Sequence, residues 1–62
     1  MADFVIVYLI KGAHVSSGPL SGDLDTTKEA ARVGLIRRGA DEFQIRSDTL
    51  DGPLIWQERR ET

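Results

Sequence analysis

The chain has 62 residues, of which 40% are hydrophobic and 29% are charged, and its formal net charge is −2. This composition is typical of a soluble globular domain and excludes a disordered chain. The acidic balance disfavours nucleic acid as a partner, because nucleic-acid binders carry a strong basic excess. The sequence contains no cysteine, so disulfides and thiolate metal sites are excluded as well.

The length predicts one domain that spans residues 1–62, with residues 60–62 as a frayed tail. The apolar run near the start is too short to cross a bilayer, which predicts that a membrane is not a partner. Asp3 stands where a signal peptide would carry basic residues, and no small-residue cleavage site follows. Together with the absence of cysteine, these features predict a cytoplasmic protein.

The clearest strand pattern covers Phe4–Lys11, which begins with seven consecutive apolar residues. Because the side chains of a strand alternate between its faces, this strand is apolar on both faces. After a turn, Ala13–Ser16 is predicted to form either a short return strand or irregular chain. The segment Ser17–Asp23 is predicted to be a loop, with at most a strand fragment around Leu20, because glycine and proline interrupt it.

A helix is predicted from Thr26 to Arg38, because both of its ends carry terminal signals. Thr26 and Glu29 have the spacing of a capping box, in which each side chain accepts a hydrogen bond from the free backbone N–H of the other residue. Gly39 is predicted to be the left-handed residue that ends the helix. Gly34, in the middle, costs about 1 kcal/mol relative to alanine, which predicts a close backbone approach there. The apolar residues form two stripes, with Leu24, Thr27, Ala31 and Leu35 on one side and Ala30, Val33 and Ile36 nearer the other.

Residues 41–47 alternate between apolar and polar, which predicts a strand with Phe43 and Ile45 on one face. A turn over residues 48–53 follows, with Gly52 as its positive-φ residue. The last strand is predicted over residues 54–59. Its predicted faces carry Leu54 and Trp56 on one side and Ile55 and Gln57 on the other.

These elements predict an α+β fold in the order strand, optional short strand, helix, strand, strand. The sheet is a single layer of three or four strands, and one helix packs on one of its faces. A strand–helix–strand pair is expected to be parallel. The chain carries no motif of a known family.

One row of the first strand, Val5, Val7 and Leu9, is left without a cover if the helix occupies the other face. Full burial of each of these side chains is worth roughly 1.5–3 kcal/mol, and the whole domain is expected to be stable by only ~3–5 kcal/mol. Two ways of covering this row are possible: a second copy of the chain packs on it, or long polar side chains on neighbouring strands lie over it. The polar side chains in question are Glu42, Gln44, Arg46 and Gln57.

We therefore predict a non-catalytic module that self-associates as a homodimer or binds an unidentified protein partner. Its predicted interaction surface comprises Val5, Val7, Leu9, Ile36 and Trp56. We predict no enzyme activity, no metal and no cofactor. His14 is the only histidine and lacks an orienting acid in the sequence around it, and Asp23 and Asp25 are read as helix-capping residues.

Two arginine doublets predict an alternative function, a weak nucleic-acid or anion-binding module. The doublets are Arg37 with Arg38 and Arg59 with Arg60. They form one basic spot if the end of the helix meets the end of the last strand, with Trp56 and Tyr8 as stacking surfaces beside it. The overall acidity of the chain argues against this alternative.

Overall fold

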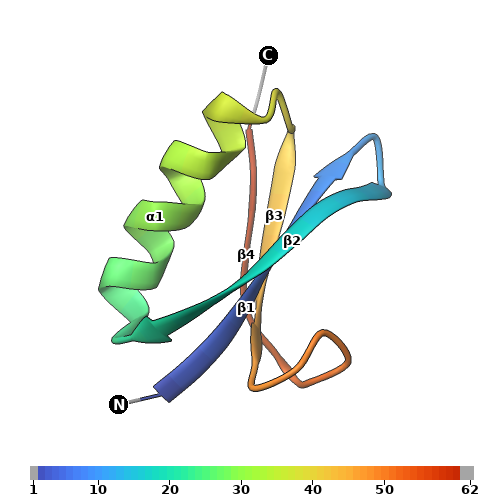
Figure 1. Cartoon of the computed structure of the whole chain (residues 1–62). Helices are drawn as coiled ribbons and strands as arrows, with labels where there is room; N and C mark the ends of the chain where they lie inside the picture. The colour runs from blue at the N-terminus through green and yellow to red at the C-terminus, as the bar shows by residue number, and fades with distance from the viewer. Residues whose placement is uncertain (1, 61–62) are drawn as a thin grey trace.

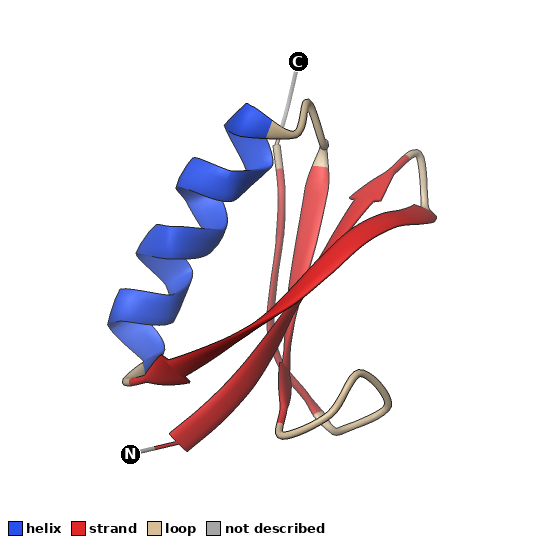
Figure 2. Cartoon of the chain, in the orientation of Figure 1, coloured by secondary structure: helices blue, strands red, loops and turns tan. Residues whose placement is uncertain are grey.

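The computed structural model describes residues 2–60 as one antiparallel sheet with one helix across one face (Figure 1). The chain runs through β1 (Ala2–Ile10), β2 (Ala13–Gly22), α1 (Leu24–Arg37), β3 (Glu42–Ser47) and β4 (Leu54–Arg59). The strands lie in the order β2-β1-β3-β4, and Figure 2 shows that the helix covers only one side of them. This architecture confirms the predicted α+β fold with one helix on a single-layer sheet.

The most apolar strand, β1, takes a central position, where it pairs with β2 on one side and β3 on the other. Both pairings are antiparallel, so β2 and β3 run parallel to each other with β1 between them. The crossover through α1 therefore joins two parallel strands, as expected for strand–helix–strand units. The strands at the two edges of the sheet are β2 and β4.

The predicted loop over Ser17–Asp23 is wrong, because β2 continues as one ten-residue strand as far as Gly22. Gly18 and Pro19 sit inside this strand and pair with Ile6 and Val5 of β1. A proline is tolerated in a sheet only where its missing N–H would face away from the neighbouring strand, and an edge strand provides such positions.

The helix begins two residues earlier than predicted, and its cap is Asp23 rather than Thr26. The Asp23 carboxylate Oδ1 accepts a hydrogen bond of 2.7 Å from the Thr26 backbone N–H. That hydrogen bond holds the pKa of the Asp23 carboxyl below its usual value. The predicted capping box is not formed, because Thr26 already lies inside the first turn. The Thr27 hydroxyl donates to the Asp23 carbonyl at 2.8 Å and closes the same turn.

The end of the helix confirms the prediction for Gly39, which has a φ of 64°. The Gly39 N–H donates to the Ile36 carbonyl at 3.2 Å, and the Ala40 N–H donates to the Leu35 carbonyl at 3.0 Å. These two bonds form a Schellman motif, in which a left-handed residue lets the chain reverse and satisfy the last carbonyls. The chain then enters β3 directly.

The core lies between the helix and the face of the sheet beneath it. Its buried residues confirm the predicted apolar rows on the helix and on the first and third strands. They are Phe4, Ile6 and Tyr8 of β1, Phe43 and Ile45 of β3, Ala31 and Leu35 of α1, and Ala40. Gly34 is also buried, and a Cβ atom there would overlap the Tyr8 hydroxyl. The predicted close approach at Gly34 is therefore confirmed, and the tyrosine side chain makes it.

In the turn between β3 and β4, the residue with a positive φ is not the predicted one. The positive φ belongs to Asp48, at 65°, and not to Gly52. At Gly52 the glycine is needed for space, because a Cβ atom there would overlap the Ser47 carbonyl oxygen.

An irregularity in the β3–β4 register changes the predicted faces of the last strand. Trp56 pairs with Ile45, whereas Leu54 pairs with Arg46, the next residue of β3. Neighbouring residues of β3 point to opposite faces, so Leu54 and Trp56 do too. The prediction that they share a face is therefore wrong.

Candidate interaction surface

The row Val5, Val7 and Leu9 lies on the open face of the sheet, but it is not a bare apolar patch. Val7 is only 6% exposed, and the other two side chains are half-buried. Gln44 of β3 stands directly opposite Val7, and Arg46 stands opposite Val5. Polar neighbours thus shield much of this row within a single molecule, as expected if long polar side chains on neighbouring strands cover it.

Hydrogen bonds hold these polar side chains over the open face. Arg46 donates through Nη2 to the Gln44 side-chain oxygen and through Nη1 to the Gly52 carbonyl, both at 3.0 Å. Gln57 of β4 donates to the Glu42 carboxylate, which is itself buried. These hydrogen bonds fix polar side chains over part of the open face. Val7 is buried within one molecule, and its part in an interaction surface stays a prediction.

The helix lies over β1, β2 and β3 but not over β4. Within residues 2–60, α1 has backbone neighbours on the first three strands and none on β4. Long side chains span the remaining distance. Arg32 donates to both carboxylate oxygens of Glu58, at 2.6 and 3.1 Å, and this pairing lowers the pKa of Glu58. The Lys28 ammonium lies 3.6 Å from the centroid of the Trp56 ring, in a cation–π contact.

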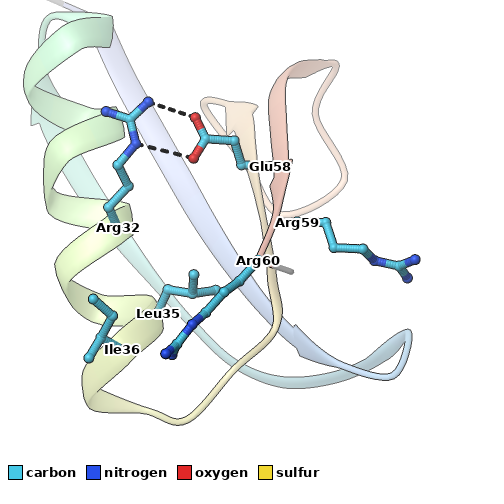
Figure 3. Close-up of a pocket in the computed structure, with 6 residues that line it drawn as sticks. All are labelled: Arg32, Leu35, Ile36, Glu58, Arg59 and Arg60. Atoms are coloured by element: carbon cyan, nitrogen blue, oxygen red, sulfur yellow. Dashed lines mark hydrogen bonds and ion pairs between the residues drawn. The ribbon is translucent and has the colours of Figure 1, made fainter. Parts of the chain in front are cut away.

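A shallow groove of about 310 Å³ runs between the end of α1 and β4 (Figure 3). Leu35 and Ile36 supply its apolar side, and Ile36 is 65% exposed. The remaining lining residues are charged: Arg32, Glu58, Arg59 and Arg60. Of the predicted surface, Ile36 and Trp56 therefore lie on the helix side of the sheet, away from the three β1 residues.

The four arginines of the predicted basic spot do not converge. Arg38 stacks over Tyr8, with its guanidinium carbon 4.6 Å from the ring centroid, and donates to the Ser16 hydroxyl at 3.3 Å. Arg59 and Arg60 border the groove but point in opposite directions in Figure 3. Arg59 lies 3.6 Å from the Glu42 carboxylate, and Arg37 is exposed on the last helical turn.

An exposed apolar run of three residues lies on the edge strand β4, and of these the predicted interaction surface contains only Trp56. Leu54, Ile55 and Trp56 are 46%, 41% and 37% exposed. The signal was present as three consecutive large apolar residues. Their position at an edge was not visible, because it depends on the order of the strands.

The backbone of β4 also faces outward along one side. The Ser47 N–H donates to the Pro53 carbonyl, and the Asp48 N–H donates to Asp3 of β1, so successive residues of β3 bond to opposite neighbours. By this alternation Phe43 and Ile45 bond to their β4 partners, Glu58 and Trp56. The alternate β4 residues, Gln57 and Arg59, therefore direct their N–H and C=O groups away from β3. We call this side of the strand the β4 edge.

The β2 edge is protected by comparison. Even-numbered residues of β3 bond to β1, so their partners Val5 and Val7 direct their backbone groups toward β3 and away from β2. Pro19 pairs with Val5, which places its nitrogen on the outer side of β2. A proline at that position removes a donor that an incoming strand would need. The two edges of the sheet are thus unequal.

Residues 2–60 contain no group of three His, Asp or Glu side chains arranged to hold a metal ion. Over the same residues, α1 is too short and too polar to span a bilayer. His14 is exposed on β2.

Comparisons with protein-family models, with curated proteins and with solved structures find no match to this chain.

Proposed function

We propose that this protein is a non-catalytic interaction module that self-associates through the β4 edge. The observation that carries this proposal is the coincidence of outward-facing backbone groups with an exposed apolar run on the same strand. An unpaired edge of this kind is a template for another strand, and main-chain hydrogen bonds then supply the contact. The apolar side chains of β4 would lose water in the same event.

Size gives a second reason to favour self-association. A domain of 62 residues is marginally stable, and covering a free edge is one way for a small domain to gain stability. The better-protected β2 edge would limit the assembly to one contact per molecule, and one two-fold contact closes as a dimer.

The test is sedimentation equilibrium of the purified chain at high micromolar concentration. We expect a species of twice the monomer mass of 6.9 kDa. A strict monomer under these conditions would overturn the proposal.

A pair of variants assigns the contact to the β4 edge. Gln57→Pro removes an N–H that faces outward, so the bonds between β3 and β4 are kept and dimerisation is expected to be lost. Gln57→Ala is the matched control, because it removes the side chain and keeps the N–H, and it is expected to dimerise. Equal dimerisation of the two variants contradicts the assignment.

If Gln57→Pro does not fold, as judged by circular dichroism, Ile55→Lys takes its place. A lysine on an edge strand opposes strand addition without disturbing the backbone. The expected result is again a folded monomer, and a dimer as tight as the wild-type chain contradicts the proposal.

Binding of nucleic acid or anions through the arginine doublets stays a prediction. Arg59 and Arg60 both border the groove, but Arg38 lies over Tyr8 and Arg37 lies on the last turn of α1, so the two doublets do not form one basic spot.

A further inference from the structure

The last strand, β4, is joined to the rest of the fold by few contacts. Among the other helices and strands of residues 2–60, only β3 has backbone neighbours on β4, and the buried core within the same residues contains no side chain of β4. Glu58 is half-buried, and the other five residues of the strand are exposed. Segments with few buried apolar contacts open at a lower cost in free energy than the whole fold.

Two side-chain contacts join β4 to the helix, and we call them together the β4 clamp. In the first, Arg32 donates to both carboxylate oxygens of Glu58, as Figure 3 shows. In the second, the Lys28 ammonium lies over the Trp56 ring. The two contacts fit side by side, because four helical residues advance about 6 Å and two strand residues advance about 6.7 Å.

The core stays covered when β4 opens. Phe43 and Ile45 of β3, which pair with β4, are fully buried in the cluster between the helix and the sheet. Opening breaks the β4 clamp and the backbone hydrogen bonds between β3 and β4. Those backbone groups then bond to water, so each broken bond costs little net free energy. Opening of β4 therefore costs less than unfolding of the whole chain.

We infer that β4 is a detachable strand that opens at the turn of residues 48–53 while the helix and the other three strands stay folded, and that the β4 clamp holds it in place. Opening uncovers the outer side of β3, so β4 acts as a cover over a second edge to which a strand can add. This inference goes beyond the proposed self-association and does not rest on it.

Hydrogen exchange of the backbone amides, followed by nuclear magnetic resonance, tests the opening along a single strand. The N–H groups of Phe43, Ile45 and Ser47 point to β4, whereas those of Gln44 and Arg46 point to β1. If β4 opens alone, the first set is expected to have protection factors at least about tenfold lower than the second set. Equal protection of the two sets overturns the inference.

Glu58→Gln tests the β4 clamp, because glutamine keeps the size and an acceptor oxygen but loses the charge that pairs with Arg32. Loss of this exposed ion pair is expected to speed exchange at Phe43 and Ile45 about threefold. Exchange at Gln44 is expected to stay as in the wild-type chain. Equal exchange of the variant and the wild-type chain at Phe43 and Ile45 contradicts the role of the clamp.

Arg38→Gln is the matched control. It also removes a charge near the helix, but the Arg38 side chain contacts Tyr8 and Ser16 of the first two strands and not β4. The ratio of exchange rates between the two sets of β3 amides is expected to stay as in the wild-type chain. A change in this ratio as large as that of Glu58→Gln contradicts the assignment of the clamp to Arg32 and Glu58.

Salt gives a second measurement on the unmodified chain. The side chains of Arg32 and Glu58 are 46% and 33% exposed, so high salt is expected to weaken their ion pair. Exchange at Phe43 and Ile45 is therefore expected to rise with salt in the wild-type chain and to rise less in Glu58→Gln. An equal rise in both chains contradicts the role of the clamp.

The outcomes distinguish this inference from the proposed function. Self-association through the β4 edge slows the opening of β4 as the protein concentration rises, but it does not change which amides depend on β4. A wild-type monomer with alternating protection along β3 overturns the proposed function and supports the inference. A dimer with equal protection of all five β3 amides overturns the inference and supports the proposed function.

Discussion

The contact between Gly34 and Tyr8 shows how one missing side chain positions the helix on the sheet. Tyr8 is buried on the central strand, and its hydroxyl occupies the space that a Cβ atom of residue 34 would need. Burial raises the pKa of the tyrosine, and the nearby Arg38 guanidinium opposes part of that rise. The propensity cost of a mid-helix glycine is thus offset by closer packing of α1 on β1.

Gly34→Ala is expected to destabilise the fold by ~1–2 kcal/mol, because overpacking at a buried site outweighs the gain in helix propensity. Chemical denaturation of the wild-type chain and the variant measures this difference. Gly18→Ala is the control, since a Cβ atom there has no neighbour within 4 Å. A variant at position 34 that is as stable as the control would contradict the packing role.

The Asp23 cap predicts a pH dependence of stability. Its folded-state pKa lies below the unfolded value, so its stabilising contribution is present above the unfolded pKa and is lost as the pH falls through the folded pKa. Asparagine caps a helix about as well without titrating. Asp23→Asn is therefore expected to lose less stability than the wild-type chain as the pH falls below about 4. Thermal melts at several pH values measure this, and identical pH profiles would contradict it.

At the scale of elements, the two edge strands differ in the backbone donors that they leave free on their outer sides. In β2, Pro19 interrupts the outer row of donors, whereas β4 has no proline within the strand. Gly18 and Pro19 are also the reason why the sequence predicts a loop where the structure has the second half of β2. The same residues that interrupt a strand in isolation protect one that lies at an edge.

Pro19→Thr is expected to restore an outward N–H on β2, so that the β2 edge can also pair with a strand of another molecule. Two such edges per molecule allow assembly beyond a dimer, and sedimentation velocity should show larger species. Ser17→Thr is the control, because it changes a side chain on the same strand without changing the row of donors. Pro19→Thr samples that contain no species above the dimer would contradict this account of the β2 edge.

At the scale of the whole molecule, stability and assembly are expected to be coupled. The chain's own polar side chains lie over part of the open face, and three consecutive exposed apolar residues, Leu54, Ile55 and Trp56, lie on β4. Association at that place adds to the stability of the folded state by mass action.

The melting temperature of the wild-type chain is therefore expected to rise by a few degrees for each tenfold increase in protein concentration above the dissociation constant. Gln57→Pro is expected to melt at a temperature that does not depend on concentration. Differential scanning calorimetry over a wide concentration range makes the comparison. A wild-type melting temperature independent of concentration would contradict the coupling.

The sequence by itself determined the local features of this protein. The alternation of Phe43 and Ile45, the apolar stripe through Ala31 and the glycine that ends the helix each depend on residues close together in the chain, so their patterns were readable. Ile36 and Trp56, which the predicted interaction surface contains, are both exposed, and their role as contacts stays a prediction.

Only the tertiary structure decided which apolar residues stay uncovered. Val7 is buried beside Gln44, which is remote in sequence but pairs with it across β1 and β3. Leu54 lies on the face opposite to the predicted one, because the register between β3 and β4 shifts by one residue. The free side of β4 exists because β1 and β3 occupy the centre of the sheet. Strand order and register arise from pairing between distant segments, and no local pattern of residues specifies them.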